Sequence, residues 1–187
     1  MMKAYTVRML DHRCGGRAVE TDMTGSKIVQ VYYGDGQGKT TAAVGQSIRA
    51  ASKGLRTIII QFLKGCDTEE FSYIQKLEPD IRLFRFEKSE VCYSDLSEEE
   101  QEEERKNIIN GFNFARKVLN AGECDMLVLD EVLGLVDLGI ITVSDIINLI
   151  DMKEDYYKLV LTGMHMPEEL VEYADLISLV EQQKGLK

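Results

Sequence analysis

The sequence predicts an α/β fold in which a mostly parallel sheet of about six strands is covered by helices on both faces. Short runs of β-branched and aliphatic residues alternate along the chain with longer stretches of helical periodicity, the order that builds parallel sheets. Several of these runs are continuously apolar, as expected of strands buried on both faces. With 187 residues the chain is long enough for one such domain with a substantial core.

The expected elements alternate in type along most of the chain. Strands are expected at residues 28–33, 57–63, 81–86, 126–131, 158–161 and 176–180. Helices are expected at residues 40–53, 71–77, 143–150 and 167–173, and a longer one begins after Ser97. In the first helix Val44, Ile48 and Ala51 share one face, and Gly54 is a good C-terminal stop.

The long helix has the clearest start signal in the sequence. Ser97 and Glu100 have the spacing of a capping box. Apolar residues at helical spacing mark its buried face: Ile108, Phe112, Ala115 and Leu119. The acidic run at residues 98–104 could be a metal or partner site, but a solvated face that favours a helix N-terminus explains it better.

The composition excludes some classes of function. A net charge of −10 argues against non-specific nucleic-acid binding, since the phosphate backbone would be repelled. No apolar run approaches the length of a membrane span, and residues 1–11 lack the apolar core of a signal peptide. The four cysteines form no C-x-x-C pair. We therefore expect a cytoplasmic protein with reduced thiols, away from membranes.

Residues 1–26 have mixed polarity and no clear period. We expect them to form an N-terminal arm that is either disordered or docked on a partner subunit. Residues 27–187 are then expected to form a single nucleotide-binding domain, because a phosphate-binding pattern follows the first strand of this part of the chain.

A glycine-rich loop between the first strand and the first helix carries that pattern. Strand, tight turn, Gly-Lys-Thr and helix is the context of a phosphate-binding loop, or P-loop. Its backbone N–H groups and helix N-terminus attract an anion, its lysine reaches phosphate oxygens, and its threonine can ligate Mg²⁺. The usual first glycine is displaced by one residue, because Tyr33 takes its place. The loop residues are Gly34, Asp35, Gly36, Gln37, Gly38, Lys39, Thr40 and Thr41.

Two further strand ends add candidate site residues. The run Leu129-Asp130-Glu131 closes a buried strand with two carboxylates, which can complete the coordination of Mg²⁺ at a P-loop. The run Gln61-Phe62-Leu63-Lys64-Gly65 ends another strand, and ligands of open parallel sheets bind beyond such ends. Lys64 and Glu70 therefore either face the site or belong to an ordinary surface loop.

Together these motifs resemble the P-loop family of corrinoid adenosyltransferases, the ATP:cob(I)alamin or cob(I)yrinic acid a,c-diamide type. The resemblance runs from Lys27 to Val180 and rests on the order of the motifs and on the displaced loop glycine. The matching runs are Gly34-x-Gly36-x-Gly38-Lys39-Thr40-Thr41-Ala42-Ala43, Arg49-Ala50, Gln61-Phe62-Leu63-Lys64-Gly65, Leu129-Asp130-Glu131, Leu161-Thr162-Gly163 and Ala174-Asp175-Leu176.

The resemblance implies a three-layer P-loop NTPase fold of the RecA-like kind, and an activity. Such an enzyme binds Mg-ATP in a reversed orientation together with a corrinoid. Co(I) attacks the ribose 5′ carbon, and triphosphate leaves whole. The resemblance also implies a homodimer and a reducing flavoprotein as electron donor.

Roles for individual residues follow from the same resemblance. The catalytic pair would be Lys39, on the triphosphate, and Glu131, which would serve Mg²⁺ with Thr40 and Asp130. Arg49 would contact the nucleotide or support residues that do. No general base is required, because Co(I) is already a strong nucleophile.

The family places an apolar wall against the lower face of the corrin, in the segment before the long helix. This chain has no tryptophan, so Val91 and Tyr93 are the expected wall residues. Phe84 and Phe86 share one strand face and belong to the core in the simpler interpretation.

Several departures from the family pattern leave two other functions open. Gln37 stands where a loop lysine is common, Met164 follows Thr162-Gly163 in place of arginine, and the family's Lys-His reads Lys184-Gly185. The chain also stops at Lys187, short of the usual tail. A general P-loop ATPase or kinase, or a non-catalytic binding relative, therefore remains an alternative.

Overall fold

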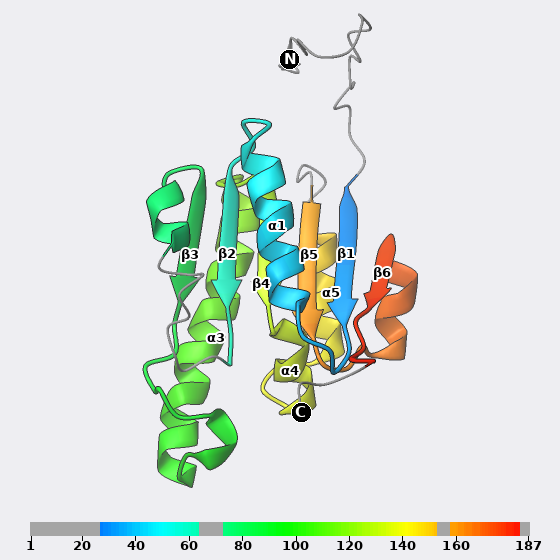
Figure 1. Ribbon diagram of the computed structural model, residues 1–187. Coiled ribbons are helices and arrows are strands. Elements are labelled where there is room, and N and C mark those ends of the chain that lie inside the picture. Colours follow the sequence, from blue (N-terminus) through cyan, green and yellow to red (C-terminus); the bar gives the residue numbers. More distant parts are fainter. Residues whose placement is uncertain (1–26, 64–72, 153–157, 184–187) are drawn as a thin grey trace, which may run out of the picture.

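The computed structural model describes residues 27–63, 73–152 and 158–183, and its centre is a six-stranded sheet (Figure 1). The strands are β1 (Ile28–Tyr33), β2 (Thr57–Gln61), β3 (Ile81–Arg85), β4 (Met126–Asp130), β5 (Lys158–Gly163) and β6 (Leu176–Leu179). They lie in the order β3-β2-β4-β5-β1-β6, and every neighbouring pair is parallel. The predicted parallel α/β fold is therefore confirmed.

Helices cover both faces of the sheet. Helix α1 (Lys39–Ala51) lies in front of it in Figure 1, whereas α3 (Glu98–Ala121) and α5 (Val143–Asp151) lie behind, and α4 (Val132–Asp137) lies near the arrowheads of the strands. The described residues also form short 3-10 helices between these elements: η1 (Gln75–Leu77), η2 (Tyr93–Asp95) and η3 (Glu168–Tyr173). This is the three-layer arrangement of P-loop NTPase folds.

The alternation of side chains along each strand creates the two layers of core. In β2, Ile58 and Ile60 pack with residues of α3 and α5, whereas Ile59 packs with Ala43 and Ala50 of α1. Strands β2, β4 and β5 are buried along their whole length, which explains their continuous apolar runs.

The apolar face that the sequence indicates for α1 is only partly buried. Val44 and Ala51 are half-buried and pack against the core on this side of the sheet. Ala43, Ser47 and Ala50 face the sheet, while Ile48 is 50% exposed. Small side chains let this helix approach the sheet closely, so the position of the large apolar residues does not mark its buried face.

The predicted face of α3 is confirmed. Ile108, Phe112, Ala115 and Leu119 are buried, and the Ser97–Glu100 capping box is present. Gly111 lets α3 lie against the aromatic core, because a β-carbon there would be 2.9 Å from the Phe86 ring and 3.1 Å from Phe62. Two smaller differences concern α4, which the sequence did not suggest, and residues 168–173, which form a 3-10 turn.

Residues 1–26 and 64–72 lie outside the described residues, as do 153–157 and 184–187. The predicted arm, Lys64 and Glu70 belong to these segments. Among the helices that are described, none combines the length and apolar character needed to cross a membrane.

Candidate functional site

The P-loop lies at the edge of the sheet where the strands end, between β1 and α1 (Figure 1). Gly34 and Gly38 have φ values of 120° and 104°, which only glycine adopts without strain. A β-carbon at Gly34 would also lie 2.3 Å from the Val180 carbonyl oxygen. The glycine that stands one residue late is therefore required both by the backbone angle and by the chain that follows β6.

Two loop N–H groups are used to fix the loop within the protein. Gly34 N–H donates to the Met164 carbonyl over 2.9 Å, and Gly36 N–H donates to the Val180 carbonyl over 2.9 Å. In the described part of the chain, the N–H groups of Asp35, Gln37, Gly38 and Lys39 have no hydrogen-bond acceptor. Because no side chain caps α1 at Gly38 either, the loop presents several donors to an anion.

Lys39 crosses the loop. Its Nζ donates to the Gly34 carbonyl over 2.6 Å and to the Gly36 carbonyl over 2.9 Å. These neutral carbonyls are weaker partners for an ammonium than phosphate oxygens would be, so an anion at the loop can draw the lysine toward itself.

Asp130 organises the site behind the loop. The side chain is buried and accepts hydrogen bonds from three side chains of different elements. Thr40 donates over 2.9 Å, Thr162 donates over 2.8 Å, and Gln61 donates over 2.8 Å. The network ties the start of α1 to β2, β4 and β5.

Glu131 follows Asp130 in an unusual backbone conformation. Its φ and ψ are 59° and 21°, in the left-handed region. Its N–H donates to the Thr162 hydroxyl oxygen over 2.8 Å, and the same hydroxyl donates onward to Asp130. Strained non-glycine residues are concentrated at functional sites, and Glu131 sits at the start of α4 beside the loop network.

Gln61 extends the network to the outer strand β3. While its amide nitrogen donates to Asp130, its amide oxygen accepts a hydrogen bond from Arg85 Nε over 2.7 Å. A guanidinium therefore lies one side chain away from the buried carboxylate.

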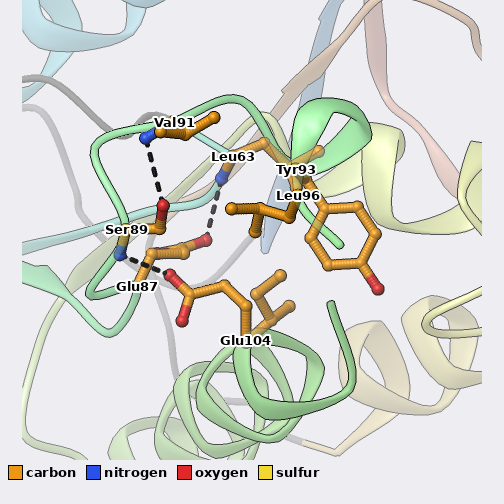
Figure 2. Close-up of a pocket in the computed structure, with 8 residues that line it drawn as sticks. Leu63, Glu87, Ser89, Val91, Tyr93, Leu96 and Glu104 are labelled. Carbon is orange, nitrogen blue, oxygen red and sulfur yellow. Dashed lines mark hydrogen bonds between the residues drawn. The ribbon is translucent and has the colours of Figure 1, made fainter. Parts of the chain in front are cut away.

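A second feature lies where β2 and β3 end. Figure 2 shows a small pocket between Leu63, the segment after β3 and helix α3. Its apolar lining consists of Leu63, Val91, Tyr93, Leu96 and Ile108. Val91 is 51% exposed, whereas Tyr93 is fixed by its hydroxyl, which donates to the Gln101 carbonyl over 3.3 Å.

Two carboxylates complete the lining of this pocket. Glu104 accepts the N–H groups of Lys88 and Ser89 over 2.7 and 2.8 Å, and the amide of Asn107 over 2.7 Å. Glu87 accepts the N–H of Leu63 over 2.8 Å (Figure 2). Burial raises the pKa of Glu87, the Leu63 N–H opposes that shift, and the nearby Glu104 adds to it.

The interpretation of the acidic run as a solvated face is thus wrong for Glu104, which is 6% exposed. Its position on the same side of α3 as Ile108 places it against the segment after β3. There it satisfies two backbone N–H groups that would otherwise lack acceptors.

The structure brings most of the predicted site residues to one edge of the sheet, but it does not bring Arg49 there. Arg49 is in the last turn of α1, about 15 Å from the loop along the helix axis. Burial lowers the pKa of Lys158 at the start of β5, and the positive charges of Arg49 and Lys53 lower it further. A nucleotide contact by Arg49 stays a prediction without structural support.

Phe84 and Phe86 pack in the core. Both rings lie against Phe114 of α3, with centroids 4.7 and 5.5 Å apart. Sequence reasoning missed the roles of Thr162, Arg85 and Glu87. Only Thr162 had a visible signal, since it belongs to the matching Leu-Thr-Gly run.

Hard oxygen donors suited to Mg²⁺ are present at the loop. Thr40 Oγ1 lies 2.9 and 3.2 Å from the two oxygens of Asp130. Among the described residues, no three acidic, histidine or cysteine side chains form a complete metal centre.

Fold and loop together define a protein of the P-loop class. The chain belongs to the family of ATP:corrinoid adenosyltransferases BtuR/CobO/CobP, whose model matches residues 25–186.

Individual relatives support this membership. The chain is similar to the corrinoid adenosyltransferase of Escherichia coli K12, with 25% identity over 151 residues, 81% of this chain and 74% of the relative. A corrinoid adenosyltransferase of Sinorhizobium sp. is 29% identical over 168 residues, 88% of this chain and 75% of the relative. An uncharacterized protein of Nostoc sp., all2391, is 28% identical over 169 residues. That match covers 80% of this chain but 42% of the Nostoc protein.

Proposed function

We propose that the protein transfers the 5′-deoxyadenosyl group of Mg-ATP to the Co(I) centre of a corrinoid and releases triphosphate. The observation that carries the proposal is the P-loop, in which the Lys39 ammonium spans two loop carbonyls and the Thr40 hydroxyl donates to the buried carboxylate of Asp130, in a chain of this family. The names of its relatives support an adenosyl transfer to corrinoids, and the loop supplies a site for the leaving group.

The reaction is a displacement at carbon. An electron pair of Co(I) forms a bond to the ribose 5′ carbon while the bond from this carbon to the triphosphate oxygen breaks. Cobalt is oxidised from Co(I) to Co(III), and triphosphate leaves with the electron pair of the broken bond. The protein must therefore bring two substrates together and stabilise the charge on the leaving oxygen.

The residues of the loop suit that leaving group. The N–H groups of Asp35, Gln37, Gly38 and Lys39 would cradle the triphosphate, and the Lys39 ammonium would neutralise part of its charge. We place the γ-phosphate where other P-loop enzymes hold the α-phosphate, so that the sugar carbon rather than the terminal phosphorus is exposed to attack.

Thr40, Asp130 and Glu131 are the residues that would hold Mg²⁺. When bound, the ion would neutralise charge on the triphosphate. Asp130 would act through the hydrogen bond that it accepts from Thr40, which turns the hydroxyl proton toward Asp130 and leaves the oxygen lone pairs for the ion. The backbone of Glu131 is fixed by the bond from its N–H to the Thr162 hydroxyl.

The corrinoid would lie beside the pocket at the ends of β2 and β3, with Val91 and Tyr93 against its lower face. Such an apolar wall keeps water and bases away from cobalt, which eases reduction of Co(II) to Co(I). A reducing flavoprotein as electron donor, a homodimeric assembly and a cytoplasmic location complete the proposal, and they rest on the family resemblance and composition alone.

The decisive experiment is anaerobic incubation with Mg-ATP and a chemically reduced corrinoid. We expect the Co(I) absorbance to decay as an alkylcobalt spectrum grows, with one triphosphate released per corrinoid. Release of ADP or single phosphates would instead identify an ATPase or kinase. Binding of both substrates without a carbon–cobalt bond would identify a non-catalytic relative.

A further inference from the structure

Large apolar side chains are exposed on β6 and on the 3-10 helix that precedes it. Strand β6 lies at one end of the sheet, next to β1, and in the described part of the chain no strand lies on its other side (Figure 1). The exposed fractions are between 39% and 51% for Val171, Tyr173, Leu176, Ile177 and Leu179. We call these five residues the β6 patch. Apolar side chains gathered on one surface are typical of binding sites.

The backbone of β6 also offers hydrogen-bonding groups at this edge. Val180 directs its own groups inward, since its N–H donates to the last residue of β1 over 2.7 Å and its carbonyl accepts from Gly36 over 2.9 Å. Successive residues of a strand point these groups to opposite sides, so those of Ile177 and Leu179 are directed away from β1. Residues 176–180 include no charged residue and no proline, which commonly protect an edge strand. The edge is therefore suited to bind an extended segment.

The charge around the β6 patch is negative throughout. Residues 166–183 include no lysine, arginine or histidine, but they include the acids Glu168, Glu169, Glu172, Asp175 and Glu181. Within the described ranges, none of these carboxylates belongs to an ion pair. An apolar strand edge with acidic surroundings is complementary to a segment that is both apolar and basic.

The N-terminal arm of the same chain has this composition. Residues 3–10 include two basic side chains, no acidic one, and the apolar side chains of Ala4, Tyr5, Val7, Met9 and Leu10. The basic residues are Lys3 and Arg8, and Arg13 and Arg17 follow. All of them precede the region that the family model matches, which begins at residue 25.

The position of β1 allows this contact within one chain. The beginning of β6 lies beside the beginning of β1, because Leu176 pairs with Gln30. A segment on the free side of β6 lies two strand spacings, or about 10 Å, from β1. Residues 11–26 can span up to about 50 Å when extended, so they can connect such a segment to β1.

We infer that residues 3–10 bind along the free edge of β6 in the same chain, with the basic residues of the arm facing the acids around the β6 patch. A second copy of the patch would instead bring like charges together. The inference concerns a surface that takes no part in the proposed reaction, and it does not depend on the proposed function.

Hydrogen exchange at β6 tests the contact. Removal of residues 1–24 leaves every described helix and strand in the chain. It should speed exchange of the Ile177 and Leu179 amides at least about tenfold, as read by mass spectrometry on peptides that cover residues 175–182, while β4 is unchanged. A synthetic peptide of residues 1–17, added to the truncated protein, should restore protection. Equal exchange in the full and truncated proteins would overturn the inference.

Charge reversal provides a second test that keeps the arm, which is useful should the truncated protein aggregate. Lys3→Glu combined with Arg8→Glu should speed exchange at β6, and adding Glu169→Lys with Glu172→Lys should return it to within about threefold of the wild type. The control adds Glu102→Lys with Glu103→Lys, which reverses as many exposed charges on α3 and should not restore protection. Unchanged exchange in the Lys3 and Arg8 variant would contradict the inference, as would equal rescue by the control.

The mass of the protein separates a contact within one chain from a contact between two chains. Light scattering should show that truncation does not lower the number of chains per particle, because the arm covers its own strand. A truncated protein with fewer chains per particle than the full protein would show that the arm binds a second copy, and the inference would then be wrong.

Discussion

The backbones at the ends of β4 and β2 are fixed by the same kind of hydrogen bond, but the acceptors of these bonds differ in charge. Among the described residues, Glu131 and Leu63 are the non-glycine residues with positive φ, and each follows one of these strands. The N–H of each donates over 2.8 Å to a side chain near the next strand, Thr162 for Glu131 and Glu87 for Leu63. The acceptor is a neutral hydroxyl in the first case and a carboxylate in the second.

This difference shows what each region can tolerate. Behind the P-loop, the buried carboxylate of Asp130 accepts hydrogen bonds from three neutral side chains, one of which is Thr40 of the loop. At the end of β2, the charge of Glu87 receives a backbone N–H but lies near a second carboxylate. Loss of charge should therefore impair the first region and relieve the second.

The largest effect is expected from Lys39→Ala, which removes the cation of the P-loop. Loss of one charge-assisted contact costs about 1.5–3 kcal/mol, or roughly tenfold to hundredfold in ATP affinity, before any effect on the transition state. Calorimetric ATP titration and turnover would measure it. Lys53→Ala, at the far end of α1, is the matched control. Wild-type turnover in Lys39→Ala would reject the loop assignment.

Thr162→Val should come next, because it leaves the Glu131 N–H without an acceptor and removes one donor from Asp130. A buried group left unpaired costs about 1–3 kcal/mol of folding stability. Denaturant unfolding would measure this loss, and the Mg²⁺ dependence of ATP binding should weaken as well. Thr142→Val, which removes the cap of α5, controls for a general loss of stability. If only stability changed in Thr162→Val, its role at the site would be contradicted.

Tyr93→Ala tests the other region, and its effect should be confined to the corrinoid. Loss of the ring opens the lower face to water, so the four-coordinate spectrum of bound Co(II) corrinoid should diminish while ATP binding stays normal. Electronic or magnetic circular dichroism spectra would show the change. An unaltered spectrum would place the wall elsewhere.

The smallest effect concerns the pH dependence of stability in Glu87→Gln. The pKa of Glu87 is raised above its ordinary value of 4.5, so the folded protein binds this proton more tightly than the unfolded chain. As pH rises through and above that value, the wild type should lose stability relative to the variant, until the folded-state pKa is passed. Unfolding curves of both proteins from acid to mildly alkaline pH would reveal it. A difference that does not depend on pH would refute the raised pKa.

The nucleotide half of the site was easier to predict than the other half. Strand runs such as Ile58-Ile59-Ile60 and the local order of strand, glycines and helix are visible in neighbouring residues. The Gln61–Asp130 and Glu87–Leu63 bonds, by contrast, depend on β2 lying between β3 and β4, which periodicity does not specify. The most buried residues of α1 were not singled out in the sequence, because they are alanine and serine rather than isoleucine.

The contact between Gly36 and Val180 has a consequence for the order in which the protein matures. The loop sequence is synthesised early, but its shape depends on a strand that emerges from the ribosome near the end of the described chain. Until β6 pairs with β1, the Gly36 N–H lacks the Val180 carbonyl that fixes the loop. The Gly34 N–H likewise lacks an acceptor until the chain that carries Met164 is in place. We therefore expect nucleotide, which the proposed function places at this loop, to stabilise the protein only after β6 has paired with β1.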